Sequence, residues 1–321
     1  MNVGMRLSEV AAKMPDAMAV AVPGKRSATG VRSYRQVSFA QLEQESDQLA
    51  AGFQAMGIPV GSRLVLAVPP SIEFVSLVFA MLKAGMVMVL VDPGMGRRNL
   101  LRCLKEVQPA GFVGIPLVQA VRSVFRRRFS RARYNVTVGR RWFWGGATFE
   151  QLLRQSDRPF VPVKTGHEDP AAIIFTTGST GPPKGVLYQH RNFNNQVDQI
   201  RDFYGIEAGE IDLPGFPLFA LFNSVMGVST VIPDMDPTRP ADVDPKNIIE
   251  PINQWEITQA FGSPALWNTV GQYCEETGEK MPSLKRVLSA GAPVPEHVLR
   301  RLQQAIHPEG EIYTLYGATE A

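Results

Sequence analysis

The first half of the chain alternates between helical and extended hydrophobic patterns. Between Ser38 and Gly57, apolar side chains recur on one helical face, at Leu42, Leu49, Phe53 and Met56. A serine before the first turn suits an N-cap, and a glycine after the last turn suits a helix end. The pattern therefore predicts one amphipathic helix over this stretch.

Two short apolar runs follow, with a helical pattern between them. Residues 62–68 and 86–91 have the length and composition of buried strands, and residues 71–84 have helical spacing. Strand, helix and strand in succession favour a parallel sheet. A further β-prone run, AAIIF, spans Ala171 to Phe175. The predicted fold class is α/β.

Residues 117–142 form a strongly basic segment. Arginine occurs at positions 122, 126, 127, 128, 131 and 133, with Phe125 and Phe129 among them at a spacing of i, i+4. One interpretation is a surface that meets membrane lipid, an acidic partner or an anionic substrate. The other is a solvated amphipathic helix that leads into the strand NVTVG, with its apolar face in the core.

The net charge, the cysteine count and the length of apolar runs exclude several classes of protein. The 321 residues carry a formal net charge of +3, which is too small to favour a nucleic-acid-binding protein. Cys103 and Cys274 are the two cysteines, so a disulfide scaffold is excluded and both are expected to be buried thiols. The beginning of the chain lacks the apolar core of a signal peptide, and no apolar run reaches the ~18 residues of a transmembrane helix. These features predict a soluble, cytoplasmic protein.

Residues 234–247 are rich in aspartate and proline. They either coordinate a cation or form a turn-rich surface loop, and the turn chemistry of these residue types favours the loop.

The stretch FTTGSTGPPKG, Phe175 to Gly185, is the clearest candidate for chemistry. Its glycines let the backbone approach an anion, its hydroxyls donate hydrogen bonds to phosphate oxygens, and Lys184 supplies positive charge. A Walker A loop is excluded, because Pro183 stands where the second glycine belongs and Gly185 stands where the Mg²⁺-binding Ser or Thr belongs.

Other catalytic motifs do not fit. The stretch PGMGRRN places Asn99 where a dinucleotide-binding fingerprint has its third small residue, so a turn between strand and helix explains it better. The sequence contains no G-x-S-x-G or H-E-x-x-H motif.

The loop resembles the signature loop of the adenylate-forming superfamily, which includes acyl-CoA synthetases, luciferases and adenylation domains. Four more stretches are similar to family segments in the same order: VSFAQLEQESDQLAAGFQAMGI, LKAGMVMVLVDPG, SAGAPV and LYGATEA. The resemblance covers essentially the whole chain. It implies ATP and Mg²⁺ as cofactors, and attack of a substrate carboxylate on the α-phosphorus with release of pyrophosphate, so that the protein works by positioning and charge neutralisation.

The resemblance also implies roles for individual residues. The β- and γ-phosphates of ATP would be held by Thr176, Thr177, Gly178, Ser179, Thr180, Gly181 and Lys184. The adenine and the acyl-adenylate would be framed by Gly291, Ala292, Pro293, Tyr316 and Gly317. Thr319 would contact the phosphates and Glu320 would coordinate Mg²⁺; together with Lys184 they are the expected catalytic residues.

One departure from the family pattern bears on the substrate. Many acyl-CoA synthetases have P-L-F-H where this chain has PLFA, so Ala220 replaces a histidine that borders the carboxylate, whereas His190 matches a separate helix start. Together with VDPG, VIPDMDPTRPA, FGSPAL and SAGAPVP, this resembles the β-lactone-forming members of bacterial long-chain olefin biosynthesis. The implied reaction is adenylation of a 2-alkyl-3-hydroxy fatty acid, followed by attack of its own hydroxyl; the alternative is a long-chain fatty acid:CoA ligase.

An apolar stripe on both sides of Ala220 suits either an acyl pocket or the core. It consists of Phe216, Phe219, Phe222 and Val225.

The expected architecture is the layered N-terminal domain of the superfamily. It comprises a first α/β subdomain over 1–190, with the phosphate loop, and an incomplete second one over 191–321, with ligands at the carboxyl ends of strands. The resemblance implies that the mobile C-terminal domain lies beyond Ala321. The expected partners are the hydroxy fatty acid substrate and other lipid-pathway enzymes, with peripheral membrane contact through 117–142 and neither nucleic acid nor a transmembrane segment.

Overall fold

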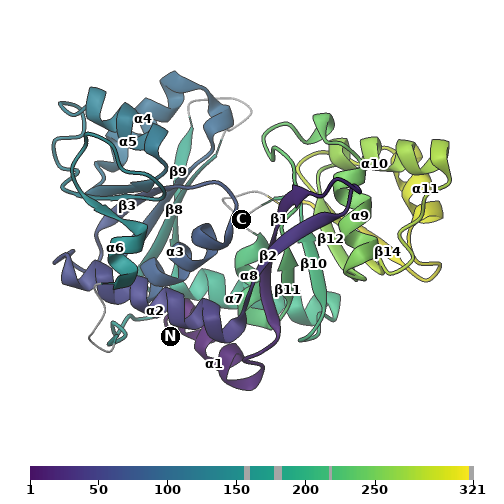
Figure 1. The fold of residues 1–321 in the computed structure, drawn as a ribbon, viewed down its shortest axis with the longest axis horizontal. Helices are drawn as coiled ribbons and strands as arrows, with labels where there is room; N and C mark the ends of the chain where they lie inside the picture. The colour runs from purple at the N-terminus through teal and green to yellow at the C-terminus, as the bar shows by residue number, and fades with distance from the viewer. Residues whose placement is uncertain (155–159, 177–182, 217–218, 318–321) are drawn as a thin grey trace. The chain divides into compact units, whose positions relative to one another are not determined.

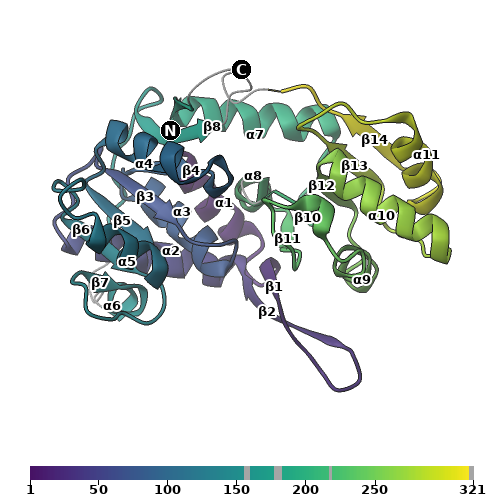
Figure 2. The same ribbon diagram turned by 90° about the horizontal axis from the view of Figure 1, so that it is seen from above.

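The computed structural model describes residues 1–154, 160–176, 183–216 and 219–317. The chain forms two compact units, each built on a seven-stranded sheet. The first unit contains Met1–Lys13 and Ala40–Gln199, and the second contains Met14–Phe39 and residues 200–317. Figures 1 and 2 show both sheets and their helices.

The second unit is therefore discontinuous in sequence. Strand β1 (Met18–Arg26) pairs in parallel with β11 (Ser229–Val231), and β2 (Arg32–Ser38) folds back on β1 in a hairpin. This arrangement differs from the continuous division expected at residue 190, because the pairing of β1 with β11 draws residues 14–39 into the second unit.

The sheet of the first unit has the order β7-β6-β5-β3-β4-β8-β9, and only β9 is antiparallel to its neighbour. Its strands are β3 (Arg63–Ala67), β4 (Val87–Val91), β5 (Gly111–Gly114), β6 (Tyr134–Thr137), β7 (Ala147–Thr148), β8 (Pro170–Thr176) and β9 (Lys184–Gln189). Its helices are η1 (Val3–Met5), α1 (Arg6–Lys13), α2 (Phe39–Ala55), α3 (Ile72–Lys83), η2 (Pro93–Met95), α4 (Arg97–Val107), α5 (Pro116–Val124) and α6 (Phe149–Arg154). Helix α7 (His190–Tyr204) begins in this unit, and its residues from Ile200 belong to the second unit.

The hydrophobic pattern explains these elements. The predicted helix begins at Phe39 and ends at Ala55, with Leu49 and Phe53 fully buried and Gly57 in a left-handed conformation at φ +68°. The predicted strands at 62–68 and 86–91 are β3 and β4, and the helix between them is α3, which Ser71 caps. The predicted turn after β4 is η2 followed by α4.

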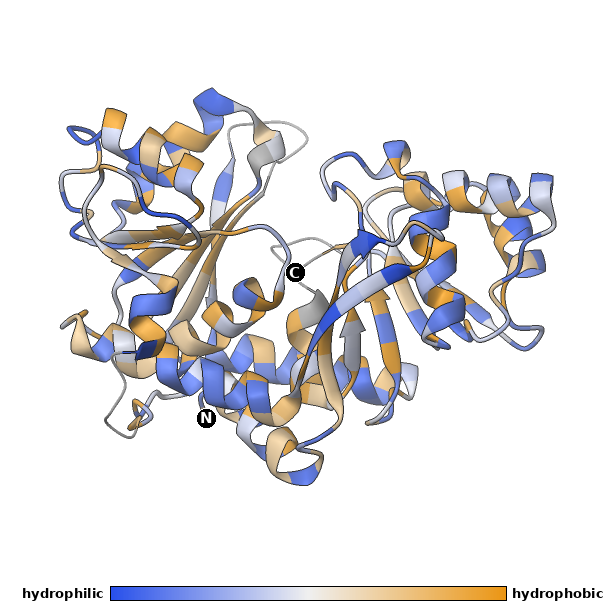
Figure 3. Cartoon of the chain, in the orientation of Figure 1, coloured by the Kyte–Doolittle hydropathy of each residue, from blue (hydrophilic) through white to orange (hydrophobic). Residues whose placement is uncertain are grey.

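A hydrophobic core lies between this sheet and helices α4 and α5. It contains Val65, Val89, Cys103, Phe112 and Phe175, and Phe129 packs edge to face on Phe112 with ring centroids 5.1 Å apart. The prediction of a buried thiol at Cys103 is therefore confirmed, and Cys274 is buried as well. Figure 3 shows the apolar character of central strands such as β8, in contrast with the polar strand β2 and the mixed polarity of the helices.

The sheet of the second unit has the order β14-β13-β12-β10-β11-β1-β2, with β2 the antiparallel strand. Its remaining elements are β10 (Ile211–Pro214), α8 (Phe219–Met226), η3 (Pro240–Asp242), α9 (Lys246–Gln254), β12 (Gln259–Gly262), α10 (Pro264–Thr277), β13 (Arg286–Ser289), α11 (Glu296–Ala305) and β14 (Glu311–Thr314). Its core packs Trp267, Val270 and Leu302 from the helices against Ala260 and Val287 from the strands.

Residues 234–245 form turns and the short helix η3, in agreement with the loop prediction, and the last two residues of the predicted range begin α9. Asp236 accepts hydrogen bonds from the backbone and hydroxyl of Thr238, which is turn chemistry. Within the described ranges, the structure contains no cluster of three His, Cys, Asp or Glu side chains that could hold a metal ion.

Candidate functional site

The predicted phosphate loop connects two paired strands of the first unit. Strand β8 ends at Thr176, β9 begins at Lys184, and these two residues are register partners. The Lys184 side chain is exposed at this position. Because β8 runs parallel to β4, the connection emerges from the carboxyl edge of the parallel strands, where ligands of open α/β sheets bind.

The base of this connection is held by an aromatic ring packed against a glycine. Phe175 is 3% exposed and pairs with Gly185 across the two strands. A Cβ atom at Gly185 would lie 2.9 Å from Cζ and 3.0 Å from Cε1 of the Phe175 ring. The glycine at the end of the motif is therefore required by packing, independently of any ligand.

Several predicted residues lie outside the described part of the chain. These are Thr177, Gly178, Ser179, Thr180 and Gly181 of the phosphate loop, and Thr319 and Glu320 near the end of the chain.

The predicted adenine-binding residues converge at one edge of the second unit. Strands β13 and β14 are parallel neighbours that end in register at Ser289 and Thr314, and the N–H of Leu315 donates a hydrogen bond of 2.8 Å to the Ser289 carbonyl. Two short segments therefore emerge side by side, about 4.8 Å apart. The segment after β13 contains Gly291, Ala292 and Pro293, and the segment after β14 contains Tyr316 and Gly317. All five residues are exposed.

Local chemistry at this edge suits a ligand. Gly291 has φ +99°, a conformation that residues with a Cβ atom rarely adopt. Because glycine has no side chain, the backbone of this turn is exposed. The hydroxyl of Ser289 is buried, and it has no hydrogen-bond partner among the residues that the structure describes. Ser289 was not among the predicted site residues, although its place in SAGAPV could have identified it.

A buried polar group supports the segment that follows β10. Asn223 on α8 donates hydrogen bonds to the Asp212 carboxylate at 2.6 Å and to the Thr230 hydroxyl oxygen at 3.1 Å. All three side chains are buried, and burial raises the pKa of Asp212 to about 7. The group ties α8 to β10 and β11, and so positions the connection between β10 and α8 that includes Phe216. Sequence reasoning did not single out any of its three members.

The apolar stripe is split by the structure. Val225 is 6% exposed and belongs to the core, whereas Phe216 is 44% exposed and Phe222 is half-buried. The side chain of Phe219 lies outside the described residues. Among the described members, Phe216 and Phe222 remain candidates for contact with a ligand.

His190 is the first residue of α7 and is fully buried. Its Nδ1 accepts a hydrogen bond from the Val3 N–H at 3.3 Å, and burial lowers its pKa to about 4. The imidazole is neutral at pH 7 and serves to anchor the beginning of the chain.

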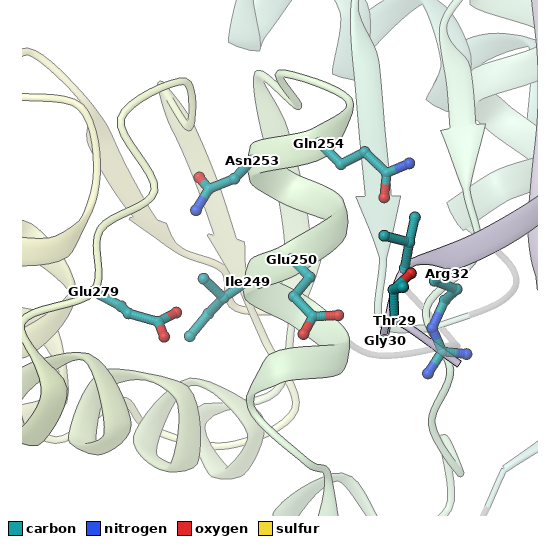
Figure 4. Close-up of a pocket in the computed structure, with 9 residues that line it drawn as sticks. Thr29, Gly30, Arg32, Ile249, Glu250, Asn253, Gln254 and Glu279 are labelled. Carbon is teal, nitrogen blue, oxygen red and sulfur yellow. The ribbon is translucent and has the colours of Figure 1, made fainter. Parts of the chain in front are cut away.

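An open groove of about 500 Å³ lies elsewhere in the second unit, between the tip of the β1–β2 hairpin and α9. Figure 4 shows Arg32 and Glu250 among its lining residues. None of the predicted site residues lines it, so it is distinct from the candidate site.

Strand β8, which leads into the predicted phosphate loop, and strands β13 and β14, which lead into the predicted adenine-binding segments, end at the carboxyl edges of two mostly parallel sheets, where α/β proteins bind nucleotides. A family model described as "AMP-binding enzyme" matches residues 7–321. The chain belongs to this AMP-binding, adenylate-forming family.

Two curated relatives are similar over nearly the whole chain, and both are named olefin beta-lactone synthetase. One, from Stenotrophomonas maltophilia, is 46% identical over 99% of this chain, and the other, from Xanthomonas campestris, is 43% identical over 99% of it. This chain covers 57% of the length of each relative.

Solved structures confirm the fold. A long-chain-fatty-acid-CoA ligase from Archaeoglobus fulgidus matches with a TM-score of 0.85 and 18% identity, over 100% of this chain and 64% of that chain. An anthranilate CoA ligase in complex with anthranoyl-AMP matches with a TM-score of 0.83 and 17% identity, over 97% of this chain and 59% of that one. The predicted α/β class and the N-terminal architecture of adenylate-forming enzymes are thus confirmed.

Proposed function

We propose that the full-length protein is an ATP-dependent, AMP-forming β-lactone synthetase. Its substrate would be a long-chain 2-alkyl-3-hydroxy fatty acid. The observation that carries the proposal is the 46% identity, over almost the entire chain, to an olefin beta-lactone synthetase. The replacement of the family histidine by Ala220 supports the same conclusion.

The first step forms an acyl-adenylate. A carboxylate oxygen of the substrate attacks the α-phosphorus of ATP, the bond to the β-phosphate oxygen breaks, and pyrophosphate leaves. Lys184 and the hydroxyls of the phosphate loop would neutralise the charge of the leaving group, and Glu320 would hold the Mg²⁺ that accompanies ATP. The exposed turns at Gly291 and Tyr316 would hold the adenine.

The second step closes the lactone ring. The 3-hydroxyl oxygen attacks the acyl carbonyl of the same molecule, the carbonyl–phosphate bond breaks, and AMP leaves as the hydroxyl proton is released. An intramolecular attack needs no thiol acceptor, only a bound conformation that holds the hydroxyl near the carbonyl.

Product analysis tests this proposal directly. The full-length protein would be incubated with Mg·ATP and a 2-alkyl-3-hydroxy acid, with and without CoA, and the products identified by mass spectrometry. We expect AMP and the acid less one water, whether or not CoA is present. A CoA thioester as the product would refute lactone formation and identify a fatty acid:CoA ligase.

Substitutions test the assigned residues. Lys184→Ala and Glu320→Gln are each expected to lower kcat/KM by about 10²–10³-fold, because each removes a group that stabilises developing charge. Lys105→Ala and Glu309→Gln, at exposed positions outside the site, are the matched controls and should retain full activity. Equal activity of a site variant and its control would refute the role assigned to that residue.

A further inference from the structure

An exposed basic and apolar surface of the first unit has no role in the proposed reaction. From Val107 to Phe149 the sequence contains eight arginines and no lysine, aspartate or glutamate. The whole chain has a net charge of only +3, so the rest of the chain is net negative. This concentration of one sign, supplied entirely by arginine, favours binding to phosphate groups.

The structure shows how this segment folds. Helix α5 ends at Val124, earlier than an amphipathic helix through the whole segment would, and Arg126 to Arg131 follow in turns before β6. Phe129 is buried in the core, and the Arg128 guanidinium lies 5.4 Å from the centroid of the Phe125 ring. The phenylalanines therefore anchor the turns and leave the arginines outside.

These arginines have no carboxylate partner within the described residues. Arg131 donates to the Gln108 side chain at 2.6 Å, and Arg122 to the Gln119 side chain at 2.9 Å, both of which are neutral. Exposed arginines elsewhere do form ion pairs, as Arg300 does with Glu296 at 3.3 Å. Among the side chains that the structure describes, none compensates the positive charge of the segment.

Apolar side chains lie exposed beside this charge. On α5, Leu117, Val121 and Val124 occupy one helical face at a spacing of i, i+4, i+7 and are 68%, 42% and 77% exposed. In the loop after β6, Trp142 and Phe143 are 59% and 79% exposed. We call the exposed residues of α5, of the turns at 126–131 and of the loop at 140–143 the basic–apolar face.

The loop at 140–143 is held in place by a buried tryptophan. Trp144 is 5% exposed, donates its indole N–H to the Thr137 hydroxyl at 3.0 Å, and contacts both exposed rings, with centroid distances of 5.4 Å to Trp142 and 5.1 Å to Phe143. One buried indole therefore holds two aromatic side chains at the surface.

The helix and the loop leave the sheet at the same edge. α5 follows β5 and the loop follows β6, which are parallel neighbours, and the N–H of Val138 donates to the Gly114 carbonyl at 3.0 Å. The phosphate loop leaves the same edge after β8, three strand spacings from β5, or about 14 Å. The basic–apolar face begins close to the base of the phosphate loop.

We propose that the basic–apolar face docks on an anionic phospholipid bilayer. Aliphatic side chains enter the acyl boundary, Trp142 and Phe143 sit at headgroup depth, and the arginines bind lipid phosphates. A nucleic acid would satisfy the arginines but offers no apolar complement to Leu117, Val121 and Val124. The proposal concerns this surface alone and does not depend on which reaction the enzyme catalyses.

Vesicle co-sedimentation of the full-length protein tests it. We expect binding to vesicles of phosphatidylglycerol and phosphatidylcholine, weak binding to phosphatidylcholine alone, and release by salt. R126Q/R127Q should weaken partitioning by about 25-fold, at roughly fivefold for each arginine near the surface. W142S/F143S should weaken it by about tenfold or more, because it removes the interfacial aromatics.

Matched control variants test whether vesicle binding depends on this surface in particular or on exposed arginines and aromatic rings anywhere on the protein. R239Q/R300Q removes two exposed arginines of the second unit, and Phe203→Ser removes an aromatic ring that is 76% exposed there. Both should bind vesicles like wild type, and circular dichroism would confirm that every variant folds. Equal binding by all variants, or no binding to anionic vesicles, would overturn the proposal. Binding to polyglutamate but not to vesicles would instead identify an acidic protein as the partner.

Discussion

Lys83 offers a direct test of how the first unit is held together. Its side chain is fully buried at the end of α3, yet its ammonium lies 2.7 Å from Glu43 and 2.7 Å from Asp47, and donates to the Ser46 hydroxyl at 2.9 Å. The lysine thus joins α3 to α2. We predict that Lys83→Met, which conserves length but removes the charge, destabilises this unit substantially.

The expected loss of stability follows from the burial of the Lys83 ammonium group. Removing one partner from a buried ion pair costs about 3–5 kcal/mol, because the remaining charge is left unpaired. Glu43 is 19% exposed and Asp47 is 37% exposed, so both carboxylates recover part of their hydration. We therefore expect a loss of about 3 kcal/mol, which for a unit of this size lowers Tm by roughly 6–12 °C.

Differential scanning calorimetry would measure this loss, with Lys105→Met on the exposed side of α4 as the control. The triple variant K83M/E43Q/D47N removes all three charges and should recover at least half of the lost stability, because no unpaired ion remains. A loss below about 1 kcal/mol in Lys83→Met, or a triple variant no more stable than the single one, would refute the reasoning.

Two further predictions concern the pairing of β8 with β9 and the buried carboxyl group of Asp212. Gly185→Ala should destabilise the base of the phosphate loop by about 1–3 kcal/mol, because the new methyl group meets the Phe175 ring. Adding Phe175→Leu should restore part of the lost stability. Urea unfolding of both variants would measure these changes, and an unchanged midpoint in Gly185→Ala would contradict the prediction. Asp212 binds its proton more tightly in the folded protein, where its pKa is about 7, than in the unfolded chain at 3.8, so its contribution to stability is complete below about pH 4 and is lost as the pH rises to about 7. The stability of Asp212→Asn relative to wild type should therefore rise between pH 5 and pH 8, by at most about 3 kcal/mol, because about 2 pH units of this window lie below the folded pKa. A pH-independent difference in urea midpoint would rule this out.

None of the helices among the described residues is long and apolar enough to cross a bilayer. The proposed contact of the basic–apolar face is with the bilayer surface, with α5 lying along the interface.

Local sequence patterns by themselves determined several strands and helices of the first unit, and the family. The period of apolar positions between Ser38 and Val91 correctly predicted α2, β3, α3 and β4, since side-chain periodicity directly reflects backbone geometry. The phosphate loop was assigned from its glycines, hydroxyls and lysine, because a motif of contiguous residues needs no knowledge of distant neighbours.

Tertiary structure alone decided the features that join distant segments. The pairing of β1 with β11 unites residues about 200 positions apart and moves 14–39 into the second unit. In the sequence, Lys83 is a single charge within a largely apolar stretch, and only its two carboxylate partners on α2 explain its complete burial. Asp212 likewise depends on Asn223 and Thr230 from neighbouring elements. A charge can be buried only where the fold supplies partners, and which partners these are is set by packing between elements rather than by the order of residues along the chain.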